Sequence, residues 1–262
     1  MRRFGLIGFP LTHSFSPAYF KEKFQREGLT DCHYEAYPLS SIEQLPNLLA
    51  QHPDLCGFNV TIPYKEQIIP FLDEIDEAAA EIGAVNCVII QRNSDSSAKK
   101  YQLKGYNTDA PAFEHCLKEG WQLPNKALIF GTGGAAKAVA FALRQLHIDY
   151  YFVSRSKHDE RTITYTDLIY SVQNNNHLDN TFFLKDYKLW INTTPVGMYP
   201  HTEESLPLDF SIISSEHYLF DLIYNPEETV FLQQGRLHGA QTKNGLAMLH
   251  QQAELSWEIF KV

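Results

Sequence analysis

The sequence predicts an α/β protein that folds as two lobes. Short apolar runs of strand length alternate with helical patterns along most of the chain, and this alternation is typical of α/β folds. Near the middle of the chain, one apolar run enters a glycine-rich turn and a helical run follows directly. The length of 262 residues suits one large domain or two modest ones.

The first half of the chain alternates apolar runs with helical patterns and ends in a hairpin. The predicted strands are Arg3–Gly8, Cys32–Pro38 and Leu55–Val60, and the predicted helices are Pro17–Glu27, Ile42–Gln51, Tyr64–Leu72 and Glu74–Ile82. Two further apolar runs, Ala84–Gln91 and Lys99–Gly105, flank the polar turn Arg92–Ala98 and predict the hairpin. These elements make up the first lobe.

The second half continues the alternation. A predicted helix from Ala110 to Glu119 leads to the glycine-rich turn. The predicted strands that follow are Lys126–Phe130, Tyr150–Val153, Leu189–Asn192 and Tyr218–Leu222, and the predicted helices are Ala135–Leu146, Glu227–Gln234 and Leu246–Phe260. The stretch Asn174–Asn180 is entirely polar apart from one leucine and predicts a loop.

The boundary between the lobes is expected between Tyr106 and Pro124, and the helix from Ala110 is expected to connect them. We predict a first domain over residues 1–106 and a second over residues 107–239. The last helix is amphipathic and rich in aromatic residues. This pattern predicts that residues 240–262 return to pack on the first domain.

Composition and charge argue against several classes of protein. The net charge of −9 disfavours generic binding to nucleic acid or to anionic membranes. The cysteines Cys32, Cys56, Cys87 and Cys116 have no C-x-x-C spacing, which favours reduced packing residues over a zinc site or disulfides. The N-terminal apolar run Phe4–Leu11 is too short for a signal peptide or a membrane span. We expect a cytoplasmic protein without a metal.

The glycine-rich turn has the pattern G-x-G-x-x-A, formed by Gly131, Gly133 and Ala136. The first glycine allows a tight turn, the second lets the backbone approach a pyrophosphate, and the alanine keeps the helix close to the sheet. Free N–H groups at the start of the helix would hold the phosphates. The alternative is a turn that binds nothing, because such short motifs often occur by chance.

Arg155 stands at the end of the next predicted strand, in the run Ser154–Lys157. In dinucleotide-binding sheets, an acidic residue at this strand end binds the 2′-hydroxyl of NAD, and a basic residue accommodates the 2′-phosphate of NADP. The run contains no acidic residue, and arginine can bind a phosphate through two parallel hydrogen bonds. The position therefore favours NADP over NAD, with a solvated loop charge as the alternative.

Polar side chains occur where strands of the first lobe end, and α/β proteins bind ligands at such ends. They are Ser14, Ser16, Asn59, Thr61, Asn86, Asn107, Thr108 and Asp109. A polyhydroxylated small molecule would give these groups hydrogen-bond partners. Taken singly they have structural alternatives, namely Ser16 and Thr61 as helix N-caps and Asn86 bonded to the backbone.

Lys65 and Asp109 are the candidate acid–base pair. Lys65 falls in the first turn of the predicted helix Tyr64–Leu72, and Asp109 directly precedes the next long helix. A carboxylate beside the ammonium group would fix its position, and a lysine held beside a ligand can transfer a proton. The alternatives are a surface lysine and a helix-capping aspartate.

Together these motifs resemble the shikimate dehydrogenase family over nearly the whole chain. The resemblance rests on eight pieces in one order: Ser14-x-Ser16-Pro17, Asn59-Val-Thr61-x-Pro63-x-Lys65, Gly83-Ala-Val-Asn86, Gly105-x-Asn107-Thr108-Asp109, Gly131-x-Gly133-Gly-Ala-Ala136, Asn192-Thr193, Asp221-Leu-Ile-Tyr224-x-Pro226 and Gly245-x-x-Met248-Leu-x-x-Gln252. The ordered set is far more specific than any one piece.

The resemblance implies an N-terminal substrate domain, a Rossmann-like NADP-binding domain, and a C-terminal helix that returns to the first lobe. It implies the reversible reduction of 3-dehydroshikimate to shikimate by NADPH, a step of aromatic amino-acid biosynthesis, with Lys65 as the general acid/base paired with Asp109. The implied substrate-binding residues are Ser14, Ser16, Thr61, Asn86, Asp109, Tyr224 and Gln252. The implied cofactor-binding residues are Gly131, Thr132, Gly133, Gly134, Ala135, Ser154, Arg155, Ser156, Leu222 and Gly245.

Two other functions stay open. A relative that oxidises quinate or uses NAD would share these motifs, and a non-catalytic NADPH sensor would share the fold. The presence of both Lys65 and Asp109 argues against the sensor. Turnover would distinguish an enzyme from a sensor, because a sensor would bind NADPH without consuming it. The expected partner is a small molecule, and the expected state is a monomer or a homodimer.

Overall fold

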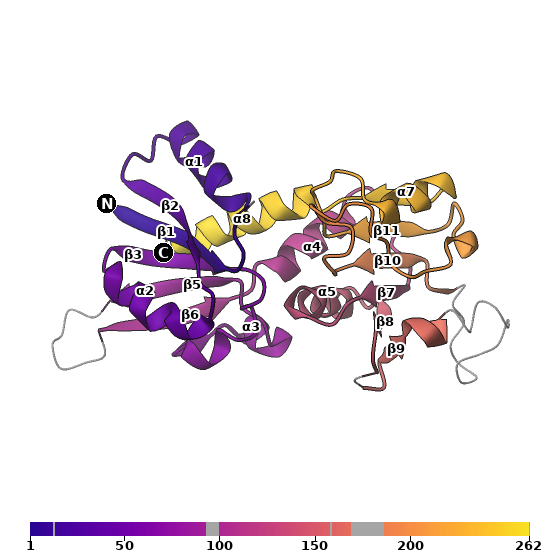
Figure 1. Ribbon diagram of the computed structural model, residues 1–262, viewed down its shortest axis with the longest axis horizontal. Coiled ribbons are helices and arrows are strands. Elements are labelled where there is room, and N and C mark those ends of the chain that lie inside the picture. Colours follow the sequence, from indigo (N-terminus) through magenta and orange to yellow (C-terminus); the bar gives the residue numbers. More distant parts are fainter. Residues whose placement is uncertain (13, 93–99, 158, 169–185, 262) are drawn as a thin grey trace. The chain divides into compact units, whose positions relative to one another are not determined.

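The computed structural model describes residues 1–12, 14–92, 100–157, 159–168 and 186–261. The chain divides into two compact units, the first formed by Met1–Asp109 with Gln252–Val262 and the second by Ala110–Gln251. Each unit contains a six-stranded sheet (Figure 1). The predicted α/β fold class with two lobes is confirmed, while the predicted domain bounds stay a prediction.

The first unit is built on a mixed sheet. In spatial order its strands are β2 (Cys32–Pro38), β1 (Arg2–Gly8), β3 (Leu55–Val60), β5 (Cys87–Arg92), β6 (Tyr101–Tyr106) and β4 (Glu74–Ile75). Strand β1 runs parallel to both of its neighbours, and β5 runs antiparallel to β3 and to β6. The predicted hairpin is thus confirmed, although most of its turn, residues 93–98, lies outside the described residues.

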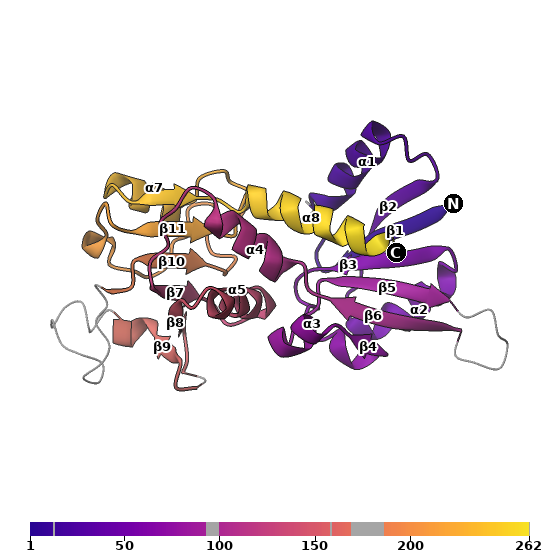
Figure 2. The ribbon, with the colours of Figure 1, turned by 180° about the vertical axis from the view of Figure 1, so that it is seen from behind.

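Helices cover both faces of this sheet, because successive side chains of a strand point to opposite faces. The helices that contribute to the two cores are α1 (Ser16–Arg26), α2 (Leu45–Gln51), α3 (Glu77–Ile82) and α8 (Leu246–Phe260). On one face, Phe4 of β1 packs against Phe24 of α1 and against Trp257 and Phe260 of α8. Figure 2 shows the C-terminal end of α8, in yellow, beside β1 and β3. The aromatic stripe of the last helix therefore packs on the first unit, while residues 240–251 belong to the second.

The second unit is built on a parallel sheet. In spatial order its strands are β12 (Gln241–Lys243), β11 (Tyr218–Asp221), β10 (Leu189–Asn192), β7 (Lys126–Phe130), β8 (Asp149–Ser154) and β9 (Thr162–Thr164). All five pairings are parallel. The strand order reverses between β7 and β10, which is the doubly wound arrangement of Rossmann-type sheets. Ligands of such sheets bind outside the carboxyl ends of the strands at that reversal.

The helices of the second unit include α4 (Asp109–Lys118), α5 (Gly134–Gln145), α7 (Val230–Leu237) and the start of α8. Helix α5 presents small side chains, among them the fully buried Ala138 and Ala142. Strands β7 and β10 are buried along almost their whole length. Parallel sheets covered on both faces give such continuous apolar runs, which is why these two strands match their predicted bounds.

The predicted helix Tyr64–Leu72 is wrong. The chain forms turns there, followed by the short 3₁₀-helix η2 (Ile69–Phe71). Pro70 has no N–H to donate to the carbonyl of Glu66, and its ring clashes with that carbonyl in an α-helix. Lys65 therefore stands in a turn rather than in the first turn of a helix.

Proline and aspartate also shift two other predicted helices. The predicted helix Ile42–Gln51 is a 3₁₀ turn, η1 (Ile42–Gln44), followed by α2 with a proline in its first turn. Helix α3 starts three residues later than predicted, because Asp76 Oδ2 accepts a hydrogen bond from Ala78 N (3.2 Å) and caps it.

Three strands among the described residues were not predicted from the sequence. These are β4, β9 and β12, which have two or three residues each. Segments this short have no measurable period, so they give no strand signal. The predicted polar loop Asn174–Asn180 lies outside the described residues.

Candidate active site

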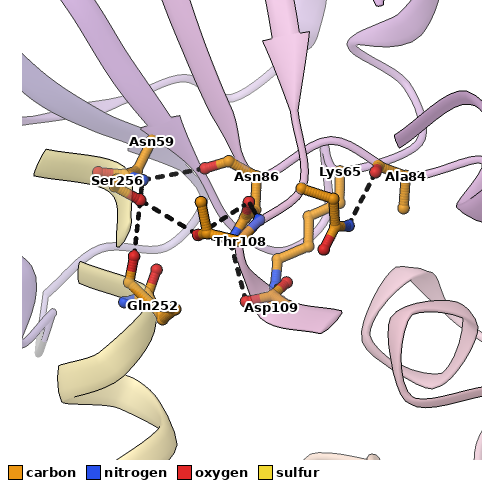
Figure 3. Close-up of polar contacts among 9 residues, drawn as sticks. Asn59, Lys65, Ala84, Asn86, Thr108, Asp109, Gln252 and Ser256 are labelled. Atoms are coloured by element: carbon orange, nitrogen blue, oxygen red, sulfur yellow. Dashed lines mark hydrogen bonds and ion pairs between the residues drawn. The ribbon is translucent and has the colours of Figure 1, made fainter. Parts of the chain in front are cut away.

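Lys65 and Asp109 form an ion pair in the first unit (Figure 3). Lys65 Nζ lies 2.7 Å from Asp109 Oδ2. The side chains are 17% and 7% exposed, so most of the pair is removed from solvent. A short charge-assisted hydrogen bond in such surroundings holds the ammonium group at one place. The structure thus brings the predicted acid–base pair together.

The sheet explains why residues distant in sequence meet at this point. Strands β3 and β6 run in the same direction because each is antiparallel to β5. Their carboxyl ends therefore lie at the same edge of the sheet, where β3 leads to the turn of Lys65 and β6 leads to Asp109. The turn is fixed on both sides, since Tyr64 Oη donates to Leu39 O (2.5 Å) and Val85 N donates to Lys65 O (2.7 Å).

Asn86 holds the second oxygen of Asp109. Its side-chain nitrogen donates to Asp109 Oδ1 (2.9 Å) and to Thr108 Oγ1 (2.9 Å). Its side-chain oxygen accepts from Thr108 N (2.7 Å). Because a backbone N–H can only donate, this bond fixes which way the amide of Asn86 points. The carboxylate of Asp109 is thereby oriented by Asn86 on one oxygen and by Lys65 on the other.

A second layer of buried polar groups supports Asn86. Asn59 donates to Asn86 O (3.1 Å) and to Ser256 Oγ (2.8 Å), and it accepts from Tyr34 Oη (2.8 Å). Sequence reasoning placed Asn59 among the polar strand ends but missed Tyr34 and Ser256. Ser256 could have been found, because it is a lone hydroxyl in the apolar stripe formed by residues 253, 257 and 260.

Three other predicted substrate-binding residues of the first unit follow strands β1 and β3 in the chain. Ser14 and Thr61 are half-buried, and Ser16 is buried as the first residue of α1. The N-cap of α1 is Phe15, so the alternative of Ser16 as an N-cap is wrong. Thr61 caps no α-helix, because turns follow it. Among the described residues, no hydrogen bond joins these three to the ion pair.

Gln252 and Tyr224 complete the predicted substrate set. Gln252 is half-buried on α8, and its carbonyl accepts from Ser256 Oγ (2.8 Å). Tyr224 is half-buried in the loop after β11. Gln252 belongs to the first unit and Tyr224 to the second.

In the second unit, the glycine turn joins β7 to α5. Gly131 has φ +110°, and a Cβ built on it would lie 2.7 Å from Thr193 Oγ1. Gly133 is the N-cap of α5, and a Cβ built there would meet nothing within 4 Å. Among the described residues, no side chain caps this helix. An open backbone surface above uncapped N–H groups fits a pyrophosphate.

Arg155 is exposed directly after β8, as the sequence predicts. Its charge acts on Tyr165, where burial raises the pKa of the phenol to about 12 and the arginine opposes the rise. Ser154 ends β8 half-buried, and Ser156 is exposed. Two hydroxyls and a guanidinium at this strand end suit a ribose that carries a phosphate.

Leu222 and Gly245, two of the predicted cofactor-binding residues, lie against each other. A Cβ on Gly245 would lie 2.0 Å from Leu222 O, so only glycine fits at this contact. Just before Leu222, the buried Asp221 accepts from Asn192 Nδ2 (3.1 Å) and from Thr229 Oγ1 (2.6 Å). These bonds tie together the loops that follow β10 and β11.

The described residues contain neither a cluster of metal ligands nor a membrane-spanning helix. No group of three or more His, Cys, Asp or Glu side chains there could hold a metal ion. Among the same residues, none of the helices combines the length and the hydropathy that a membrane span requires.

Comparison with known proteins finds shikimate dehydrogenases that match nearly the full length of this chain. The family model described as "Shikimate dehydrogenase substrate binding domain" matches residues 6–88. A shikimate dehydrogenase (NADP(+)) of Methanosphaera stadtmanae is 36% identical, covering 98% of this chain and 90% of its own. One of Syntrophomonas wolfei is 38% identical, covering 97% and 88%.

Solved structures give the same result. Shikimate dehydrogenase 1 of Peptoclostridium difficile superposes with a TM-score of 0.79 at 35% identity, covering all of this chain and 92% of its own. Shikimate 5-dehydrogenase of Thermus thermophilus, solved with NADP(H) and shikimate, has a TM-score of 0.77 at 32% identity, covering 99% and 93%. The resemblance seen in the motifs is confirmed, and the chain belongs to the shikimate dehydrogenase family.

Proposed function

We propose that this protein catalyses the reversible reduction of 3-dehydroshikimate to shikimate with NADPH, a step of the shikimate pathway of aromatic amino-acid biosynthesis. The observation that carries the proposal is the ion pair of Lys65 and Asp109, whose second carboxylate oxygen is held by Asn86. A non-catalytic nucleotide sensor has no need for an ammonium group fixed in this way. The family membership of the whole chain supports the same activity.

Lys65 is the proposed general acid/base. Bound NADPH supplies the hydride that reaches the carbonyl carbon of the substrate. In this direction, the ammonium group of Lys65 gives a proton to the carbonyl oxygen as that oxygen gains electrons, and in the reverse direction the neutral amine takes the proton back. Asp109 stays a carboxylate throughout and keeps Lys65 in place. Proton and hydride then balance the two-electron reduction without a further reactant.

The proposed substrate contacts divide by chemistry. Ser14 and Ser16 donate to the carboxylate of shikimate, with Tyr224 as a third donor. The ring hydroxyls of shikimate bind Thr61, Asn86, Asp109 and Gln252. Each of these groups can both fix the substrate and exclude water from the reacting carbon.

The proposed cofactor contacts belong to the second unit. The pyrophosphate lies on the turn formed by Gly131, Thr132, Gly133, Gly134 and Ala135. The 2′-phosphate binds Arg155, with the flanking hydroxyls of Ser154 and Ser156, and the nicotinamide lies against Leu222 and Gly245. The free space above Gly133 and the uncapped N-terminus of α5 support this assignment. We further propose that the enzyme is cytoplasmic and acts as a monomer or a homodimer.

The test is turnover with four substrate pairs. NADP⁺ reduction is followed by absorbance with shikimate and with quinate, and each assay is repeated with NAD⁺. Strong turnover with shikimate and NADP⁺ alone is the expected result. Turnover with quinate or NAD⁺ at a similar rate would replace this specificity with a broader one. Binding of NADPH without turnover in any assay would overturn the proposal in favour of a sensor.

A further inference from the structure

Ser256 is a polar residue that the proposed substrate and cofactor contacts do not use. It stands in α8 one helical turn after Gln252, and its side chain is fully buried. Serine is a poor residue for a buried helical face, because a helix can accept a hydrogen bond from its hydroxyl but offers that hydroxyl no donor. The hydroxyl can donate to the carbonyl one turn earlier in the helix, but its other partners have to come from neighbouring elements.

Three partners saturate this hydroxyl. Ser256 Oγ donates to Gln252 O (2.8 Å), accepts from Asn59 Nδ2 (2.8 Å) and lies 3.2 Å from Thr108 Oγ1 (Figure 3). One donated and two accepted bonds are the full capacity of a serine hydroxyl. The hydroxyl thus joins α8 to β3 and to the segment that carries Asp109.

The orientation of the Asn59 amide determines which of its atoms faces Ser256. Tyr34 Oη donates to Asn59 Oδ1 (2.8 Å), so the amide nitrogen of Asn59 points the other way. That nitrogen donates one hydrogen bond to Asn86 O (3.1 Å) and the other to Ser256 Oγ. The backbone of Asn86 and the hydroxyl of Ser256 are therefore held by the same amide group. A shift of α8 along its axis would break the bond to Ser256 first.

We propose that Ser256 is a positioning residue that sets the register of α8, and with it Gln252, against Asn86 and the Lys65–Asp109 pair. The proposal rests on the proposed function, because Gln252 is the group through which Ser256 acts on shikimate. Ser256 itself touches no substrate. Its hydroxyl bonds to the carbonyl of Gln252 and to the amide that holds Asn86, and so it couples the two sides of the proposed hydroxyl-binding site.

The test compares Ser256→Ala with the wild-type enzyme in shikimate oxidation by NADP⁺. Alanine is smaller than serine and favours helix, so this variant should fold. We expect a roughly tenfold fall in kcat/KM for shikimate, mainly through KM, which corresponds to one lost buried hydrogen bond. The KM for NADP⁺ should stay within twofold. A purely structural role would lower the melting temperature and leave the KM for shikimate unchanged, and that result would overturn the proposal.

A double-mutant cycle shows whether the effect passes through Gln252. In a Gln252→Ala background, Ser256→Ala should change kcat/KM by less than twofold, because the side chain to be positioned is gone. A full tenfold effect in that background would overturn the proposal. Glu258→Ala is the matched control, since it removes an exposed ion pair to Lys261 from the same helix.

The same assays separate this inference from the proposed function. Absence of shikimate turnover in the wild-type enzyme would refute the function and, with it, the role of Ser256. Normal wild-type turnover with an unaltered Ser256→Ala variant would refute the role of Ser256 alone.

Discussion

Lys65 illustrates what a single residue contributes when its position is fixed. Lys65→Ala removes the only proposed proton donor and leaves Asp109 with its bond from Asn86. We expect kcat to fall by roughly 10²–10⁴-fold, the usual contribution of general acid–base catalysis. NADPH affinity, measured by fluorescence titration, should stay close to that of the wild type. Near-wild-type turnover would remove Lys65 from the mechanism.

The control for this variant is a lysine of the same unit outside the site. Lys104 forms an ion pair with the exposed Glu74 at the edge of the sheet. Lys104→Ala removes the same charge from a position outside the proposed site, so it should leave kcat unchanged. A similar loss in both variants would point to the net charge of the unit rather than to proton transfer.

Arg155 is the residue on which cofactor choice depends. Its guanidinium is exposed after β8, where the 2′-phosphate of NADP is proposed to bind. Arg155→Ala should weaken NADPH binding much more than NADH binding, because only NADPH carries that phosphate. Titration with both cofactors measures the two effects. Arg161→Ala, at an exposed arginine paired with Asp149, should alter neither affinity. Equal weakening of NADPH and NADH by Arg155→Ala would contradict the assignment.

At the scale of elements, the turn between β7 and α5 allows two glycines to be compared. Gly133→Ala should leave folding intact, because its φ of −78° suits any residue and the added Cβ has open space. That space is the proposed pyrophosphate site, so we expect NADPH affinity to fall. Gly131→Ala should instead lower the melting temperature, because φ is +110° and the Cβ would lie 2.7 Å from Thr193 Oγ1.

Calorimetric melting and NADPH titration on both variants check this contrast. The informative pattern is a stable Gly133→Ala protein that binds NADPH weakly. A Gly133→Ala protein that binds NADPH as tightly as the wild type would show that the pyrophosphate lies elsewhere. A Gly131→Ala protein with an unchanged melting temperature would show that the turn can relax without cost.

The elements also show where sequence reasoning succeeds. Helix α8 and four strands match their predicted bounds, because long amphipathic or apolar runs carry a clear period. The helix predicted over Tyr64–Leu72 does not form, because Pro70 outweighs the local helical pattern.

In the candidate site, Lys65, Asn86 and Asp109 were predicted, because polar residues directly after apolar strands stand out in the sequence. Ser256 was missed, since its partner Asn59 is almost two hundred residues away and only the fold reveals the contact.

At the scale of the whole molecule, stability depends on two buried titratable groups with opposite effects. Burial raises the pKa of the Asp221 carboxyl from its usual 3.8 to about 6. Burial lowers the pKa of the His217 imidazole from its usual 6.5 to about 4, with the charge of Lys188 acting in the same direction. Between pH 3.8 and about 6, the folded chain keeps a proton on Asp221 that the unfolded chain releases. Between about pH 4 and 6.5, the folded chain lacks the proton that the unfolded chain carries on His217.

These two shifts change the free energy of unfolding with opposite signs. The raised pKa of Asp221 stabilises the fold fully below pH 3.8, and this contribution is lost as the pH rises through 6. The lowered pKa of His217 stabilises the fold fully above pH 6.5, and this contribution is lost as the pH falls through 4. Each contribution changes by about 1.4 kcal/mol per pH unit, so between pH 4 and 6 they nearly cancel.

When either residue is substituted, the free energy of unfolding should therefore change with pH as the other residue alone dictates. Relative to wild type, the free energy of unfolding of Asp221→Asn should rise with pH from 4 to 6, because His217 is left to act alone. That of His217→Asn should fall over the same range, because Asp221 is left unopposed. Urea unfolding followed by circular dichroism at pH 4, 5 and 6 measures both slopes, with the exposed His33→Asn as the control. Slopes of equal sign in the two variants would show that the two groups do not oppose each other in the folded chain.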